Sequence, residues 1–194
     1  PVGLPNNDGK NSRNSVQDAG CNSSADDITF VTELLNTYAN DDTEFYCGGF
    51  SVGSGFVSRL SIDENLSSRF NGFIMTSSGY QKNDLDFINN GNYPNIFISN
   101  GDIDGISPSD GGYGTASFND NKCYDFSSLK DSINEWSNLI CGNNTTETED
   151  SYGNVIFSNS NCNGTVYGII FKDTGHSPTS ESVTSWIKDN NGTD

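Results

Sequence analysis

The sequence predicts an α/β fold with a mostly parallel sheet and helices on both faces. Short apolar runs at 72–76, 95–99 and 165–171 are typical of buried strands, and segments of helical periodicity alternate with strands along the chain. Strands that alternate with helices along the chain favour a parallel sheet that helices cover on both sides. The length, without an internal repeat, fits a single domain over residues 1–194.

The first elements are expected to be a loop, a helix, a strand and a second helix. Residues 1–25 are rich in Pro, Gly, Asn and Ser without an apolar period, which predicts a loop. Apolar residues recur at helical spacing over 26–39, behind an acidic pair that suits the positive end of a helix dipole. The run 44–47 predicts a strand that breaks at Gly48-Gly49, and 53–60 predicts a helix directly after it.

The second half of the chain continues the alternation. Apolar side chains recur every three or four residues from about Ser127, which predicts a helix. A loop rich in Thr, Glu and Asp is expected next, followed by the β-branched strand at 165–171. A helix at 182–189 closes the predicted domain.

The composition excludes two classes of partner. Asp and Glu number 26 against 9 Lys and Arg, so the net charge of -17 repels nucleic-acid phosphates and anionic membranes. No stretch approaches the roughly 18 apolar residues that span a bilayer. We therefore expect a soluble protein that binds neither nucleic acid nor membrane.

Cysteines and glycosylation sequons favour a secreted, extracellular protein. The five cysteines form no C-x-x-C pair, which favours disulfides over a zinc or redox site. No signal peptide opens the chain, so a targeting segment is expected to have been removed or never included. The candidate glycosylation sites are Asn22, Asn65, Asn143, Asn144, Asn163 and Asn191.

Only one disulfide can be suggested from the residues. Cys123 and Cys141 lie at opposite ends of a predicted helix, about 20 Å apart at 1.5 Å per residue, which is too far for a bond. Cys141 and Cys162 flank a single loop and are the preferred pair. Cys21, Cys47 and Cys123 stay unassigned.

A candidate nucleophile lies at the predicted turn from strand to helix. Gly49-Phe50-Ser51-Val52-Gly53 has the form G-x-S-x-G, in which the serine sits on a cramped turn above a helix N-terminus. Gly49 and Gly53 are expected to supply the room that this turn needs. The alternative is an ordinary Gly/Ser turn in a chain with 21 glycines, so a base and an acid must support the hypothesis.

The candidate base is His176, the only histidine in the chain. It follows the last predicted strand, where a serine hydrolase with such a turn needs the group that accepts the hydroxyl proton. A lone histidine is otherwise more often a surface or packing residue.

The candidate acids, Asp102 and Asp104, follow the predicted strand at 95–99. A carboxylate at this place would orient the imidazole and stabilise its charged form. The alternatives are a D-x-D-G turn or a calcium loop, although an EF-hand would require a Glu at its twelfth position. The chain order Ser, Asp, His is that of α/β-hydrolases and differs from the trypsin and subtilisin orders.

Several segments together resemble secreted α/β-hydrolase esterases of the feruloyl esterase and polyhydroxyalkanoate depolymerase type. Residues 26–30 are similar to the family's DDV-x-F helix start, and 46–51 to its Y-V-x-G-x-S strand and elbow. Residues 100–108 with Gly111-Gly112 resemble its H-G-x-x-D-x-x-V-P…G-G segment, and 175–178 its G-H-S-W-P. The likeness spans most of the chain.

The resemblance implies an α/β-hydrolase fold and a Ser51, His176, Asp104 triad, and it selects Asp104 over Asp102. The backbone N–H of Val52 would help to bind the oxyanion. The implied activity is that of a secreted carboxylic-ester hydrolase without metal or organic cofactor. The implied substrate is a polymer, either a polysaccharide that carries feruloyl or acetyl esters or a polyhydroxyalkanoate.

Other positions bear on the same resemblance. The spacing of Trp136, Cys141 and Cys162 follows the family and supports the disulfide between 141 and 162. Three positions depart from the family pattern: Asn100 stands for a histidine, Gly105 for a proline and Ser54 for a glycine.

The beginning of the chain resembles a loop that family members reach only after several strands. We therefore expect the N-terminal part of the sheet, and the loop that supplies a second oxyanion donor, to be missing. The elbow strand would then expose an apolar edge that a partner segment or chain covers. Two rival hypotheses are a non-catalytic secreted binding or structural domain on a hydrolase scaffold, and a calcium-binding surface module that uses Asp102 and Asp104.

Overall fold

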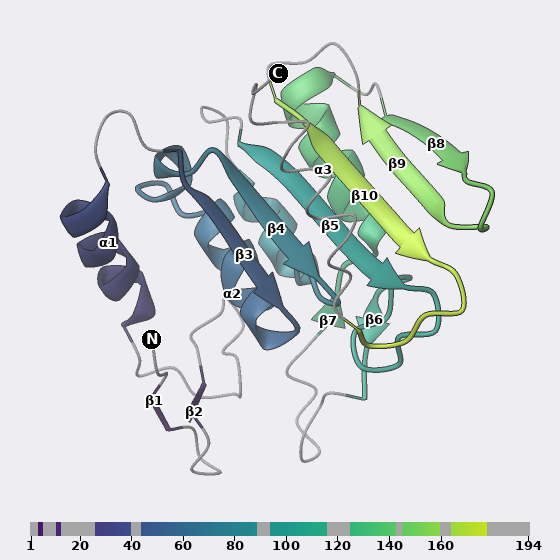
Figure 1. The fold of residues 1–194 in the computed structure, drawn as a ribbon, viewed down its shortest axis with the longest axis horizontal. Coiled ribbons are helices and arrows are strands. Elements are labelled where there is room, and N and C mark those ends of the chain that lie inside the picture. Colours follow the sequence, from purple (N-terminus) through teal and green to yellow (C-terminus); the bar gives the residue numbers. More distant parts are fainter. Residues whose placement is uncertain are drawn as a thin grey trace.

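The computed structural model describes residues 4–5, 11–12, 26–39, 44–88, 94–115, 125–142, 145–159 and 164–177. Its main sheet has six strands in the order β3-β4-β5-β10-β9-β8 (Figure 1). These strands are β3 Tyr46–Phe50, β4 Gly72–Thr76, β5 Asn95–Gly101, β8 Thr145–Glu149, β9 Val155–Asn159 and β10 Val166–Phe171. Two short antiparallel pairs join β1 Leu4–Pro5 to β2 Asn11–Ser12, and β6 Gly112–Tyr113 to β7 Asp125–Phe126.

α-Helices precede β3, connect β3 to β4 and precede β8 along the chain, whereas β8, β9 and β10 follow one another without a helix in the described part of the chain. The helices are α1 Asp27–Tyr38, α2 Val52–Ser61 and α3 Leu129–Cys141, with 3-10 turns η1 Ser67–Arg69 and η2 Lys82–Phe87. β3, β4, β5 and β10 run parallel, and β9 and β8 extend the sheet antiparallel. The prediction of an α/β fold with a mostly parallel sheet is confirmed. Among the described residues, no helix is long and apolar enough to cross a membrane.

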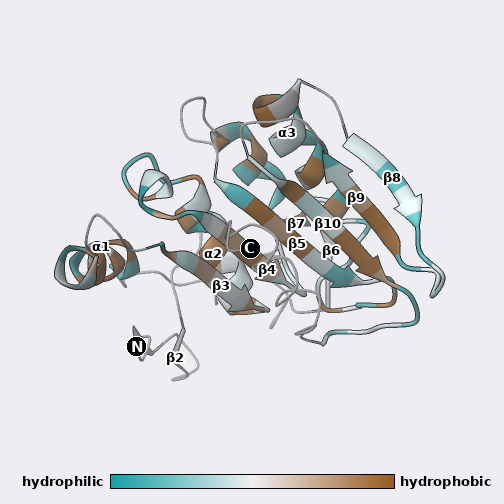
Figure 2. Cartoon of the chain, turned by 45° about the horizontal axis from the view of Figure 1, so that its top comes forward, coloured by the Kyte–Doolittle hydropathy of each residue, from teal (hydrophilic) through white to brown (hydrophobic). Residues whose placement is uncertain are grey.

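The larger hydrophobic core lies on one face of the sheet. Strand residues such as Phe73, Ile96 and Val166 pack there against α2 and α3, whose Leu60 and Trp136 are almost completely buried. The hydrophobic colouring of Figure 2 follows the central strands, whereas β8 at the sheet edge is hydrophilic. A substantial core therefore fixes the four parallel strands.

The opposite face carries a smaller buried cluster of Ile74, Phe97 and Ile169. All three described helices contribute to the larger cluster instead, α1 through Leu35. Helices on both faces are therefore not shown by the described residues. The helix predicted at 182–189 lies outside them.

Two predicted boundaries are wrong for identifiable reasons. β3 does not break at Gly48-Gly49, because both glycines pair with β4, opposite Ile74 and Met75. The strand therefore runs on to Phe50, directly before the candidate nucleophile. Part of the predicted N-terminal loop also forms the short β1–β2 pair.

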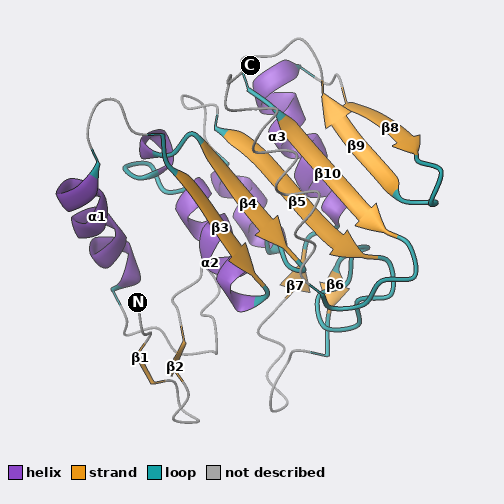
Figure 3. Cartoon of the chain, viewed as in Figure 1, coloured by secondary structure: helices purple, strands orange, loops and turns teal. Residues whose placement is uncertain are grey.

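The loop predicted between α3 and the last strand contains a β-hairpin, β8–β9 (Figure 3). β8 reads Thr-Thr-Glu-Thr-Glu and is mostly exposed, so it lacks the apolar alternation by which a half-buried strand is recognised. Asp150 turns the chain, since its carboxylate accepts hydrogen bonds from the backbone N–H groups of Tyr152 and Asn154. The hairpin places two antiparallel strands beside β10.

Several predicted features fall outside the described residues. These are Cys21, Cys123, Cys162 and the sequons at Asn22, Asn143, Asn144, Asn163 and Asn191. The side chain of Cys141 is also not described, so the pairing with Cys162 stays a prediction. Among the described positions, Cys47 is a free thiol and the sequon residue Asn65 is exposed.

Candidate active site

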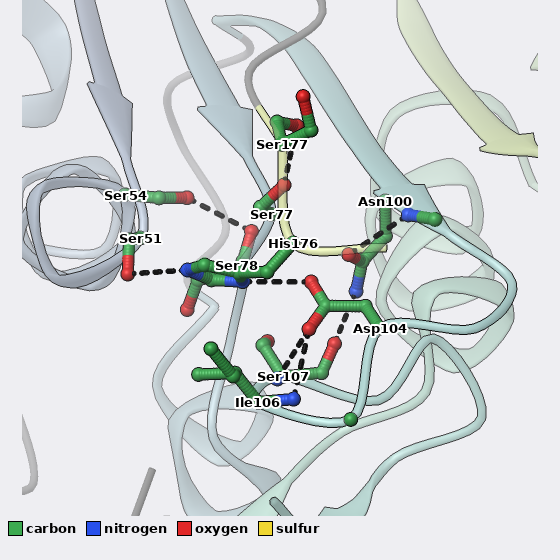
Figure 4. Close-up of polar contacts among 12 residues, drawn as sticks. Ser51, Ser54, Ser77, Ser78, Asn100, Asp104, Ile106, Ser107, His176 and Ser177 are labelled. Carbon is green, nitrogen blue, oxygen red and sulfur yellow. Dashed lines mark hydrogen bonds and ion pairs between the residues drawn. The ribbon is translucent and has the colours of Figure 1, made fainter. Parts of the chain in front are cut away.

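Three predicted site residues meet at the carboxyl ends of the parallel strands (Figure 4). Ser51 directly follows β3, Asp104 lies three residues beyond β5, and His176 lies five residues beyond β10. Because the carboxyl ends of parallel strands lie at one edge of a sheet, residues far apart in the sequence converge there.

The imidazole of His176 joins the other two side chains. Its Nε2 lies 2.8 Å from the Oγ of Ser51, and its Nδ1 lies 2.8 Å from an Oδ of Asp104. A carboxylate can only accept hydrogen bonds, so Nδ1 carries the proton and Nε2 is free to accept from the Ser51 hydroxyl. This tautomer is the one that a general base needs.

Ser51 occupies a strained turn between β3 and α2. Its φ is 55° and its ψ is -122°, a backbone conformation that residues other than glycine rarely adopt. The backbone N–H of Ser51 donates to the carbonyl of Thr76 at 3.0 Å, which fixes the turn to the end of β4. The strain is therefore held in place by neighbouring structure.

The two glycines of the G-x-S-x-G segment have different surroundings. A Cβ on Gly49 would lie 2.3 Å from the carbonyl oxygen of Gly53, so this turn needs a glycine at position 49. A Cβ on Gly53 would meet no atom within 4 Å. The prediction that both glycines supply room is wrong for Gly53.

Asp104 is held in a tight loop. Its side chain has no solvent exposure, and its Oδ1 accepts the backbone N–H groups of Ile106 and Ser107, each at 2.9 Å. The Nδ2 of buried Asn100 donates to the carbonyl of Ser107 at 2.7 Å, and its Oδ1 accepts from the N–H of Gly101. Both Asp104 oxygens are therefore engaged, one by backbone and one by the imidazole.

Asp102, the other candidate acid, faces a different group. Its Oδ1 accepts a hydrogen bond from the backbone N–H of Thr174 at 3.1 Å, within the loop that leads to His176. The structure thus brings Asp104, not Asp102, to the imidazole. No three His, Cys, Asp or Glu side chains within the described ranges gather as a metal site requires.

Val52, the predicted oxyanion donor, is the first residue of α2. Backbone N–H groups in the first turn of a helix lack intrahelical partners and point toward the positive end of the dipole. The amide of Val52 thus belongs to the first turn of α2 and directly follows Ser51, as an oxyanion donor of this kind requires. One residue further along α2 than Gly53, the buried Ser54 donates its hydroxyl to the carbonyl of Ser78 at 2.8 Å.

Apolar side chains surround the candidate site. The ring of Phe50 lies 5.1 Å from the His176 ring, centroid to centroid. Phe50, Val52 and Ile106 are each about two-fifths exposed, with values of 39%, 44% and 39%. A ligand that reaches Ser51 would thus contact apolar surface as well as polar groups.

The sequence did not reveal the residues that support this geometry. Asn100 and Gly101 were visible only as part of a family-like segment. Ser77, whose hydroxyl donates to the carbonyl of Ser177, showed no pattern, because no local spacing encodes a contact between positions 100 residues apart.

Comparison of the chain with known proteins identifies no related protein. No family model matches the chain, and neither a curated protein nor a solved structure shows significant similarity to it. The geometry of Ser51, His176 and Asp104 is therefore the basis for a functional conclusion.

Proposed function

We propose that the protein is a serine carboxylic-ester hydrolase with an α/β-hydrolase fold. The observation that carries this proposal is the continuous pair of 2.8 Å contacts from Ser51 through His176 to Asp104. The strained φ of Ser51 between a strand and a helix supports it, because this turn presents the hydroxyl at the top of the sheet.

The proposed reaction begins with attack of the Ser51 Oγ on the ester carbonyl carbon. His176 Nε2 takes the hydroxyl proton, and the Val52 N–H helps to stabilise the negative oxygen of the tetrahedral intermediate. Collapse of the intermediate breaks the bond to the alcohol, which leaves with the proton from His176. An acyl ester on Ser51 remains.

Water completes the cycle by the same route. His176 removes a proton from the attacking water, the acyl–Ser51 bond breaks, and the proton returns to the Ser51 oxygen. Asp104 keeps the Nδ1 proton in place and stabilises the imidazolium in both halves.

The substrate class and location follow from the family resemblance. We propose a polymeric substrate, either a polysaccharide that carries feruloyl or acetyl esters or a polyhydroxyalkanoate, and a secreted protein. The apolar side chains of Phe50, Val52 and Ile106 around Ser51 are suited to such acyl groups. The exposed sequon at Asn65 is in keeping with secretion.

A partner at the sheet edge is part of the proposal. β3 is the terminal strand of the described main sheet, and its Gly48 and Phe50 are exposed. A strand is the natural partner for such an edge. We propose that a further segment or chain pairs with β3.

Labelling with a fluorophosphonate probe tests the proposal. The wild type should react, whereas Ser51→Ala and His176→Ala should not, and Ser151→Ala, at an exposed serine in the hairpin turn, should react like the wild type. Asp104→Asn should lower kcat by about 10⁴ because the amide favours the wrong tautomer of the histidine. Folded wild-type protein that neither labels nor hydrolyses p-nitrophenyl esters would instead support a non-catalytic domain.

A further inference from the structure

The loop that carries His176 has to cross the sheet to reach Ser51. Its strand, β10, is separated from β3 by β5 and β4. Three strand spacings of about 4.8 Å place β10 about 14 Å from β3. A segment of this reach needs fixed points along its way if the imidazole is to stay within hydrogen-bond distance of Ser51.

The first fixed point lies at the end of β5. The backbone N–H of Ile103 donates to the carbonyl of Thr174, and the N–H of Thr174 donates to the side chain of Asp102, both at 3.1 Å. Gly101 lies so close to this carbonyl that no side chain fits between them. These contacts fix the loop two residues before His176.

The second fixed point lies at the end of β4, nearer to Ser51. Ser77 directly follows β4, and its hydroxyl donates to the carbonyl of Ser177 at 2.7 Å (Figure 4). Ser77 is 1% exposed, and its own N–H donates to the carbonyl of Ser99 at 2.8 Å. The contact fixes the residue immediately after His176.

The backbone of Ser77 shows that this arrangement is held against an intrinsic cost. Its φ is 49°, in the left-handed region that residues other than glycine, asparagine and aspartate rarely occupy. This conformation directs a hydroxyl, buried between the ends of two strands, at the loop that carries the candidate base. Strained residues of this kind cluster at functional sites.

We propose that Ser77 is a positioning residue that sets the approach of His176 to Ser51, an inference that rests on the proposed hydrolase function. The hydroxyl of Ser77 donates to the carbonyl of Ser177 and not to a group of the proposed triad. It acts through the carbonyl of Ser177, which is one residue away from the imidazole. With this anchor removed, His176 spends more time out of reach of the Ser51 hydroxyl, and proton transfer becomes slower without a change in ester binding.

Two substitutions separate the hydroxyl from the backbone strain. Ser77→Ala removes the hydroxyl but keeps the Cβ, and with it the strain of the positive φ, whereas Ser77→Gly removes both the hydroxyl and the strain. Both variants should lower kcat on a p-nitrophenyl ester about 10-fold or more, with KM changed less than about twofold. Thr146→Val is the matched control, because it removes a hydroxyl-to-carbonyl contact in the hairpin, far along the sheet. It should retain the wild-type kcat.

Other results would overturn the proposal. Wild-type kcat in Ser77→Gly, with or without loss in Ser77→Ala, would show that the hydroxyl does not position the base. A fall in active-site titre with unchanged turnover per labelled site would show that Ser77 only supports folding.

A measurement that needs no activity separates this proposal from the proposed function. His176 is the only histidine, so its ring Nδ1–H gives a single imidazole resonance in proton NMR. Ser77→Gly should accelerate the exchange of this proton with water by about 10-fold, even if the wild type hydrolyses nothing. An unchanged exchange rate would overturn the positioning role, whereas an inactive wild type with faster exchange in the variant would overturn only the hydrolase proposal.

Discussion

Gly101 packs so closely against the carbonyl of Thr174 that a Cβ at position 101 would come within 1.9 Å of the oxygen. Gly101 ends β5, and Thr174 belongs to the loop that carries His176. The last residue of β5 thus determines how near the loop after the neighbouring strand β10 can lie.

A methyl group at this position should therefore displace the base. We expect Gly101→Ala to lower kcat/KM by about 10² or more, because a displacement of about 1 Å at a reacting group has such an effect. Gly105→Ala is the control, since a Cβ there meets open space. Ester hydrolysis by both variants checks the prediction, and equal activities would contradict it.

The two glycines around Ser51 should differ in their tolerance of substitution. Gly49→Ala places a Cβ against the backbone of Gly53 and should prevent the turn from forming, so that fluorophosphonate labelling is lost. Gly53→Ala fits open space on α2 and gains helix propensity of up to about 1 kcal/mol. Its thermal midpoint should equal or exceed that of the wild type. A tolerated alanine at position 49 would refute the steric account of the turn.

The buried carboxyl of Asp84 should make stability depend on pH. Burial raises the pKa of Asp84 to about 6, and its side chain accepts the backbone N–H of Gln81 at 2.8 Å. The unfolded chain, with a carboxyl pKa of about 3.9, binds this proton more weakly. The folded state therefore loses up to about 3 kcal/mol of stability from this group as pH rises from about 4 to about 6, and little more above.

Unfolding by urea at pH 4.5 and pH 7.5 checks this expectation. Between pH 4.5 and pH 7.5 the wild type loses the stability that protonated Asp84 contributes. Asp84→Asn has no proton to lose, so its free energy of unfolding at pH 7.5, relative to that at pH 4.5, should be higher than in the wild type. Asp86→Asn, at an exposed carboxylate of the same 3-10 turn, should behave like the wild type. An identical pH dependence in wild type and Asp84→Asn would show that Asp84 does not cause it.

Cys47 should be protected in the folded protein. It packs against the larger core from β3, and burial raises the pKa of its thiol to about 11. Since the thiolate is the reactive form, iodoacetamide at pH 8 should leave Cys47 unmodified in the native state. Peptide mapping by mass spectrometry should find it alkylated once guanidinium unfolds the chain. Rapid alkylation of the native protein would contradict the protection that we expect from the partly buried position of Cys47.

The sequence predicted the central part of the fold well, because the buried strands have strong apolar patterns. β4 was predicted with its observed bounds, and the helix predicted at 53–60 is one residue longer at each end in the structure. The hairpin was missed because β8, at the edge of the sheet, is mostly exposed and has no apolar face from which a strand could be predicted. The break predicted at Gly48-Gly49 was wrong because pairing with β4 overrides the local preference of these glycines for a turn.

The candidate site was predictable where a short motif met an unusual residue. Ser51 lies in a defined pentapeptide, and His176 is the only histidine, so few combinations were possible. From the residues themselves, Asp102 and Asp104 remained equal, since they are two positions apart in one loop. Their difference arises from tertiary contacts, as one carboxylate meets the imidazole and the other meets the backbone of Thr174.

The order of the strands has a consequence for synthesis on the ribosome. The hairpin β8–β9 is made before β10, yet among the described strands it joins the rest of the sheet through β10 alone. A nascent chain that ends before residue 166 therefore holds a hairpin with no strand to join. His176 follows the same late strand, so both the complete sheet and the contacts of Ser51, His176 and Asp104 require that β10 has been made. Until residue 176 has been made, the Ser51 hydroxyl lacks the imidazole that it meets in the folded chain, so a shorter nascent chain lacks the proposed base.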